Sequence, residues 1–188
     1  GQGFSLVAMA SPAEDPEFQR FVAVGRWLHE RGLGAPALLN VSEQENTLVM
    51  QDVGRRSLYL LATSAGAAEA ERDRAYEEVV DHLLLLQAAT DRAAEECPLA
   101  VDRRLAHEDL RWETGYFRER FLQGHCGLAG QDLAGLDGEF EELARAAARQ
   151  PLVLLHRDFQ SQNIHLQDGA VNRAYSTVDL GAGIRVIK

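Results

Sequence analysis

One short polar segment between two apolar runs most constrains what this chain can fold into. The apolar run 152–155 stops at the sequence HRD (156–158), Asn163 follows five residues after the aspartate, and apolar residues then resume in alternation. Short apolar runs bounded by turn residues, and alternation of apolar with polar residues, both indicate strands. We therefore predict a strand over 152–155, a polar loop, and a second strand near 164–167.

The loop fits the pattern H-R-D-x-x-x-x-N of phosphoryl-transfer loops. That chemistry needs a carboxylate beside the attacking hydroxyl, and oxygen ligands for the Mg²⁺ that neutralises phosphate charge. Asp158 is the predicted catalytic base, and Asn163 is a predicted Mg²⁺ ligand. A second metal-binding carboxylate is expected after a short hairpin, where Asp179 stands at the end of a predicted strand, 174–178. The alternative is an ordinary turn in which Asp158 and Asn163 cap their own backbone.

Composition narrows the partners of the chain. Its 188 residues carry a formal net charge of -10, which disfavours nonspecific nucleic-acid binding because that requires basic surface. No apolar stretch approaches the ~18 residues of a membrane span, so we expect no membrane partner. Cys97 and Cys126 form no C-x-x-C pair, which favours a reduced, cytoplasmic protein. Lys188 is the only lysine, so no lysine in the body of the chain can take part in chemistry.

Hydrophobic periodicity and turn residues predict an α+β chain. Ser11 is a plausible N-cap for a helix over 13–31, and the composition changes near Gly54, which is the only candidate boundary between lobes. The other predicted elements are strands at 4–10, 37–42 and 47–51, helices at 57–63, 67–92, 104–123 and 137–149, and the three strands named above.

Four segments carry a resemblance to a known family. They are FVAVGRWLHERGLGAPALL (21–39), LVMQDVG (48–54), ETGYFRERFL (113–122) and HRDFQSQNI (156–164), and they occur in the right order along most of the chain. The chain resembles the aminoglycoside phosphotransferase and choline kinase-like family. Within that family it is similar to the bacterial amino-sugar kinases that phosphorylate N-acetylmuramate and N-acetylglucosamine at the anomeric position.

The resemblance implies a protein kinase-like fold of two lobes, with ATP and Mg²⁺ in the cleft and a hydroxyl of a sugar or amino sugar as acceptor. Residues 1–53 would form an incomplete N-lobe with a hinge near 50–54. Residues 54–188 would form a truncated, mostly helical C-lobe with the catalytic loop 156–163 and the metal-site segment 175–183. Backbone groups near the hinge residues Gln51, Asp52 and Val53 would bind adenine.

The acceptor side is less defined by the sequence. Glu113 would lie near the sugar, or on a solvated helix face, and Arg157 would hold a nearby carboxylate or be solvated. Gln160 replaces the lysine that protein kinases carry two residues after the aspartate, which favours a small-molecule substrate. Aminoglycosides would require an acidic pocket and N-acetylmuramate would require arginine, so both classes stay open, as does the oligomeric state.

Three departures from the family pattern bear on activity. The chain has no Gly-rich phosphate loop, Met9 stands about where the phosphate-binding lysine belongs, and Asp179 is followed by an altered sequence, LGAG (180–183). Because both ends stop within the expected domain, we expect a fragment of a longer enzyme that binds Mg-ATP weakly or not at all on its own. The alternative is a catalytically inactive pseudokinase with a nucleotide-sensing or scaffolding role.

Overall fold

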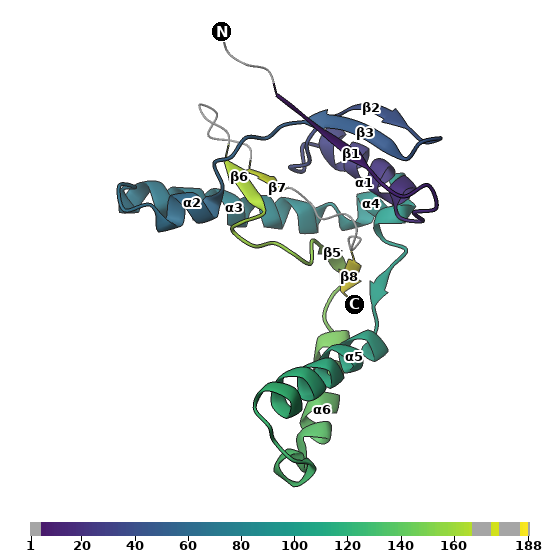
Figure 1. The fold of residues 1–188 in the computed structure, drawn as a ribbon, viewed down its shortest axis with the longest axis vertical. Coiled ribbons are helices and arrows are strands. Elements are labelled where there is room, and N and C mark those ends of the chain that lie inside the picture. The colour runs from purple at the N-terminus through teal and green to yellow at the C-terminus, as the bar shows by residue number, and fades with distance from the viewer. Residues whose placement is uncertain (1–4, 167–173, 177–184, 188) are drawn as a thin grey trace.

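The computed structural model of the protein describes residues 5–166, 174–176 and 185–187. A small antiparallel sheet comes first in the chain and is followed by helices and by short strands (Figure 1). The predicted mixture of helices and strands is therefore confirmed. The division into lobes at residues 53 and 54 stays a prediction.

The N-terminal sheet contains β1 (Leu6–Ala10), β2 (Leu38–Ser42) and β3 (Thr47–Gln51), in the order β1-β3-β2 with antiparallel pairing. Met9 pairs with Leu48 across β1 and β3. Helix α1 (Phe18–Glu30) covers the sheet, and its Phe18 and Val22 are buried against Leu48. The three strands lie where alternation predicts them.

Helix α1 begins at Phe18, so the predicted start at residue 13 is wrong. The preceding segment is held in turns because Asn46, in the loop between β2 and β3, donates its side-chain amide to the carbonyls of Pro12 and Ala13 at 2.8 and 3.1 Å. Ser11 does not cap the helix; its backbone N–H bonds the Asn46 carbonyl at 2.9 Å. These contacts join residues more than thirty positions apart, which a local helix signal cannot reveal.

The middle of the chain is helical, with α2 (Leu58–Thr63), α3 (Glu69–Ala88), α4 (Thr90–Glu96) and the 3₁₀ turn η1 (Pro98–Ala100). The single helix predicted over 67–92 is thus two helices. The Thr90 hydroxyl donates to the Gln87 carbonyl at 2.6 Å and accepts the backbone N–H of Leu154 at 2.8 Å. Thr90 therefore joins the break between α3 and α4 to the strand that precedes the polar loop.

The helix predicted over 104–123 begins instead with a two-residue strand, β4 (Arg104–Leu105), followed by α5 (His107–Phe117) and the π-helical η2 (Arg118–His125). The short η3 (Gly130–Leu133) and helix α6 (Leu136–Ala148) follow. Helices α5 and α6 lie side by side and extend away from the sheet (Figure 1). An edge-to-face contact of Phe117 with Phe140 and an ion pair of Arg118 with Asp137 join these two neighbouring helical segments.

Four short strands complete the described fold: β5 (Val153–Leu155), β6 (Ile164–Leu166), β7 (Ala174–Ser176) and β8 (Arg185–Ile187). Strands β6 and β7 form the predicted antiparallel hairpin. Strand β8, which was not predicted, pairs parallel with β4 and antiparallel with β5. The polar loop 156–163 connects β5 to β6, as the sequence indicates.

The largest core cluster joins α1 to the helical part of the chain. Val24, Trp27 and Leu28 of α1 pack with Leu86 of α3 and Leu154 of β5, and all are buried. Each such side chain contributes about 2 kcal/mol of burial free energy relative to exposure. The core therefore fixes α1 and the N-terminal end of the polar loop in one packed unit.

Candidate functional site

Asp158 and Asn163 lie side by side at one end of the loop between β5 and β6. The Asn163 side-chain amide donates to Asp158 Oδ2 at 2.6 Å and to the Asp158 carbonyl at 3.1 Å. Backbone bonds from Gln160 to Asp158 and from Asn163 to Gln160, both 2.9 Å, tighten the turn. The loop thus brings together the carboxylate and the amide that the sequence pattern selected.

His156 precedes this pair and is buried, with 7% of its surface exposed. Its ring meets the Phe159 ring edge to face at 5.4 Å. Burial lowers the pKa of His156, opposed by the negative charge of Asp158 and assisted by the nearby His82. The imidazole is thus packed within the fold beside Phe159 and is not positioned as a surface base.

Arg157 and Glu113 are brought together across the fold. Arg157 Nη2 lies 3.7 Å from Glu113 Oε1 on α5, which joins the loop to the α5–α6 pair. The Arg157 backbone has φ of 68°, a left-handed conformation that is uncommon outside glycine and occurs often at functional turns. Of the two readings of Arg157, the one in which it holds a nearby carboxylate agrees with this contact.

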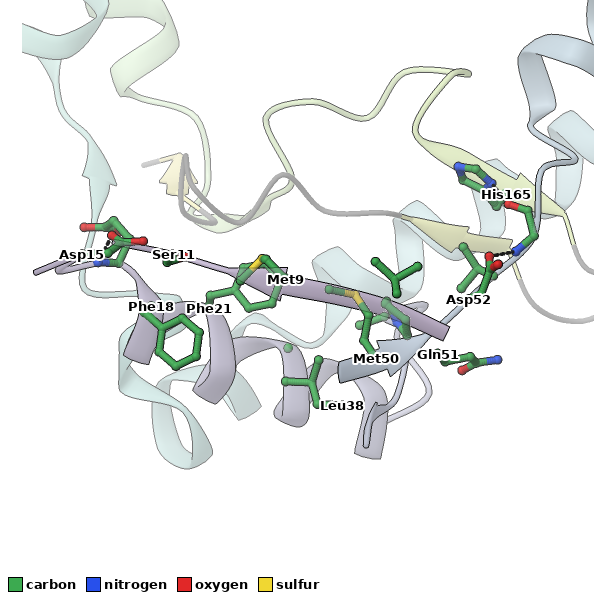
Figure 2. Close-up of a pocket in the computed structure, with 17 residues that line it drawn as sticks. Met9, Ser11, Asp15, Phe18, Phe21, Leu38, Met50, Gln51, Asp52 and His165 are labelled. Carbon is green, nitrogen blue, oxygen red and sulfur yellow. Dashed lines mark hydrogen bonds between the residues drawn. The ribbon is translucent and has the colours of Figure 1, made fainter. Parts of the chain in front are cut away.

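A cavity of about 530 Å³ lies beside the predicted hinge, a volume typical of small-molecule sites (Figure 2). Gln51, Asp52 and Val53 all line it. The backbone N–H of Gln51 is already donated to the Ala37 carbonyl at 2.9 Å within the sheet region, so Asp52 and Val53 are the better placed of the three for base recognition. The apolar part of the wall comes from several elements: Val7, Met9, Phe18, Phe21, Leu38 and Met50.

Asp52 is held in place at the hinge end of this cavity. Its Oδ1 accepts the Gly54 backbone N–H at 2.8 Å and its Oδ2 accepts the Ser5 hydroxyl at 2.6 Å. These hydrogen bonds lower the pKa of Asp52. Gly54 has φ of 86°, so a glycine is suited to this turn, and its carbonyl meets His165 Nδ1 at 2.9 Å.

The described lining of the cavity includes three carboxylate side chains and contains no arginine or lysine. Asp15, Glu17 and Asp52 contribute carboxylates, while Met9 stands in β1 where the phosphate-binding lysine was expected. Arg103 bonds Glu17, and Arg20 lies 3.4 Å from the same carboxylate. The charge of Glu17 is therefore balanced by two arginines that do not themselves line the cavity.

The Arg103–Glu17 contact and the position of His165 were both missed by sequence reasoning. The first joins residues 86 positions apart and leaves no local signal. The second could have been found, because His165 comes two residues after Asn163 on a strand whose side chains alternate between two faces.

The donor set of the loop fits Mg²⁺, which prefers carboxylate and amide oxygens, and Asn163 would supply one such ligand. Within the part of the chain that the structure describes, no group of three or more His, Cys, Asp or Glu side chains could hold a metal ion. Asp179, the other predicted ligand, lies outside the described residues. In the same described part, no helix is long and apolar enough to cross a membrane.

Comparison with known proteins identifies the class that the loop and fold indicate. The chain belongs to the phosphotransferase enzyme family, whose model matches residues 1–172. The resemblance inferred from the four sequence segments is thereby confirmed.

Two curated proteins are similar to this chain over most of its length. The N-acetylmuramate/N-acetylglucosamine kinase of Pseudomonas aeruginosa is 31% identical over 166 residues, covering 87% of this chain and 46% of the relative. The protein of the same name from Pseudomonas putida is 28% identical over 167 residues, covering 87% of this chain and 45% of the relative. The chain therefore spans about half the length of the curated relatives it matches.

Proposed function

We propose that this chain carries the catalytic loop of an ATP-dependent phosphotransferase that acts on a hydroxyl of a sugar or amino sugar. The observation that carries the proposal is the hydrogen-bonded pair of Asp158 and Asn163 on the loop between β5 and β6. Family membership supports the phosphotransferase class, and the names of the two relatives support an amino-sugar acceptor.

In the proposed reaction the Asp158 carboxylate accepts a hydrogen bond from the acceptor hydroxyl and takes its proton as the oxygen attacks the γ-phosphorus of ATP. The bond from that phosphorus to the bridging oxygen of the β-phosphate breaks, and ADP leaves with the bonding electron pair. Asn163 orients that carboxylate through its amide N–H and would offer its amide oxygen to Mg²⁺, with Asp179 as the further proposed ligand. Bound Mg²⁺ would neutralise phosphate charge. The hinge backbone at Asp52 and Val53 would bind the adenine beside the cavity.

For the acceptor, we propose the space next to the Arg157–Glu113 contact, because Arg157 directly precedes the base. The guanidinium group of Arg157 can pair with a carboxylate of an acidic amino sugar, while the carboxylate of Glu113 can accept hydrogen bonds from sugar hydroxyls.

Cys97 and Cys126 form no disulfide, which supports the proposed cytoplasmic location.

A phosphorylation screen tests the proposal. The chain is incubated with Mg-ATP and N-acetylglucosamine, N-acetylmuramate or an aminoglycoside, and the phosphorylated product is measured by mass spectrometry. We expect transfer to an amino sugar, and a loss of about 100-fold or more with Asp158→Asn. Asp81→Asn, on the exposed surface of α3, is the matched control and should leave the rate unchanged. Equal rates for Asp158→Asn and the wild type would contradict the assignment, and transfer to the aminoglycoside alone would favour the other acceptor class.

A second candidate function is a nucleotide-sensing or scaffolding pseudokinase. It is favoured by Met9 at the expected lysine position and by the acidic polar lining of the described cavity. Nucleotide binding without transfer to any acceptor in the screen, at protein concentrations that saturate binding, would support it. The expectation that these residues belong to a longer enzyme stays a prediction.

A further inference from the structure

The helical segment formed by α5 and η2 carries an exposed aromatic face. The rings of Trp112 and Tyr116 stack with their centroids 5.3 Å apart, and the rings of Phe117 and Phe121 stack at the same distance. Each of these four residues keeps between 46% and 63% of its surface exposed. Exposed apolar surface gathered in one place marks interaction sites in soluble proteins. With two charged neighbours, the aromatic face consists of Trp112, Glu113, Tyr116, Phe117, Arg120 and Phe121.

The two charged side chains stand at opposite ends of this face. Glu113 comes three and four positions before Tyr116 and Phe117, and Arg120 comes three and four positions after Phe117 and Tyr116, so all four share one side of the helix. The Arg120 guanidinium group lies over the Tyr116 ring, 5.7 Å from its centroid. Glu113 lies 3.7 Å from Arg157, and 49% of its side chain stays exposed. The face therefore has an acidic end and a basic end.

The order of these residues is complementary to itself when two copies of the helix run antiparallel. If a twofold axis passes between Tyr116 and Phe117, Glu113 lies at the level of Arg120 of the partner subunit, because both are equally far from the axis. Twofold symmetry repeats this ion pair at the other end of the interface. Charges at matched positions set the orientation in which helices pair, and a parallel arrangement would instead bring like charges together.

The remainder of the face matches in the same arrangement. Trp112 lies at the level of Phe121 of the partner subunit, so the exposed rings of the two copies would cover each other. The stretch 112–121 holds two acidic and two basic residues and has no net charge, whereas the whole chain carries -10. Two acidic chains therefore meet least repulsion at a segment of this kind. The pair of α5 and α6 extends away from the sheet (Figure 1), so a second copy can bind there without approaching the sheet.

We propose that two copies of this chain associate through the aromatic face, antiparallel and with twofold symmetry, and that ion pairs between Glu113 and Arg120 of the partner subunit set the orientation. The inference goes beyond the proposed function and does not depend on it. Tryptophan, tyrosine and arginine are the side chains that contribute most to protein interfaces. If each aromatic side chain buries about 100 Å², the interface covers roughly 800 Å² in total, which is in the range of weak association. We therefore expect a dissociation constant of about 10 to 100 μM.

Sedimentation equilibrium measures this association directly. Between about 1 and 500 μM chain, we expect the apparent mass to rise from 20.7 kDa toward twice that value. Fluorescence gives a second signal, because Trp27 is buried and Trp112 is exposed: the emission of Trp112 should shift to shorter wavelength over the same range. A mass of 20.7 kDa at every concentration would overturn the inference and leave the face to a different occupant.

Charge reversal tests the orientation. Glu113→Arg brings two cations together at each end of the interface, and Arg120→Glu brings two carboxylates together, so each variant alone should associate at least about tenfold more weakly. An equimolar mixture of the two variants should associate within about threefold of the wild type, because unlike copies restore both ion pairs. Glu77→Arg, on the exposed surface of α3, is the matched control and should associate like the wild type.

Truncation of a ring tests the aromatic contacts without a change of charge. Trp112→Ala alters an exposed side chain, and we expect it to weaken association about tenfold while the chain stays folded. Circular dichroism and thermal melts establish that each variant is folded before it is compared. Wild-type association in Trp112→Ala would overturn the role of the aromatic face.

The mixture separates a specific interface from a general loss of structure. Only two folded partners can restore association when they are combined, so a mixture that associates more tightly than either variant alone supports the inference. A mixture no tighter than its separate components, or single variants that associate like the wild type, would overturn the antiparallel arrangement. Phosphate transfer by the wild type and its loss in Asp158→Asn are measured independently, so this inference and the proposed function can fail separately.

Discussion

The side-chain amide of Asn163 donates a 2.6 Å hydrogen bond to Asp158 Oδ2, so the proposed metal ligand and the proposed base hold each other within one loop. A hydrogen bond of this length to a carboxylate holds both side chains in place, and it uses one donor of Asn163 and one acceptor site of Asp158. The two side chains are therefore held in a defined arrangement without a bound ligand.

Replacing Asn163 should affect stability and transfer together. Asn163→Ala removes the bond to the Asp158 carboxylate, and we expect a loss of about 1 kcal/mol in the free energy of unfolding, because the pair is only partly buried. Phosphate transfer should fall about 100-fold or more, and its dependence on Mg²⁺ concentration should change. Gln162→Ala, at the exposed neighbouring position, is the control for urea denaturation and for rate. A loss of stability with an unchanged Mg²⁺ dependence would argue against a metal-ligand role for Asn163.

A cation in place of Met9 should raise the affinity of the cavity for ATP relative to adenosine. Met9 lines the cavity and packs against the sheet core, so Met9→Lys places an ammonium group at its edge. We expect ATP affinity to rise about tenfold relative to adenosine at low ionic strength, with an unfolding free energy lower by about 1 to 2 kcal/mol. Met9→Leu is the size-matched control. Equal gains in affinity for adenosine and ATP would show that the lysine does not interact with the charge of the phosphates.

The buried His156 and the partly buried His82 should make the fold sensitive to acid. Burial lowers the pKa of His82 and of His156 below the ordinary value of 6.5. As the pH falls through about 6.5, the unfolded chain binds protons at these two histidines and the folded chain does not. The free energy of unfolding therefore decreases below that pH, and it continues to decrease until the pH passes the lowered pKa values of the folded chain. His82→Asn combined with His156→Asn should flatten this part of the stability curve measured by urea denaturation. The exposed His125→Asn should not, and a wild-type stability that stays constant between pH 7 and 5 would contradict the prediction.

Leu154 should be the most costly position to truncate near the loop. It is fully buried in the cluster that joins α1, α3 and β5, and it lies two residues before His156. Leu154→Ala should lower the unfolding free energy by about 3 kcal/mol through lost burial and the resulting cavity. Leu85→Ala, whose side chain is 60% exposed, should change it by less than about 1 kcal/mol. Similar losses at both positions would show that the β5 cluster is not the main core.

Local patterns predicted the elements well where one run of residues decides the structure. The strand before His156, the hairpin of β6 and β7, and the three strands of the N-terminal sheet follow from alternation and turn residues. The predictions failed where distant residues decide. Asn46 holds the segment before α1 in turns, so that the helix begins later than predicted. Thr90 bonds Leu154 where the predicted long helix is divided into α3 and α4. Pairing with β8 makes Arg104 and Leu105 a strand instead of a helical turn.

The sequence by itself determined which functional groups the loop carries, because residue type and spacing alone place a carboxylate five residues before an amide between two apolar runs. Only the tertiary structure decided which groups meet that loop and the hinge. Glu113 reaches Arg157, Glu17 reaches Arg103, and His165 reaches Gly54 through contacts between residues 44, 86 and 111 positions apart. Contacts of that range depend on how the core clusters pack α1, α3 and β5 together, and no periodicity in a single segment records them.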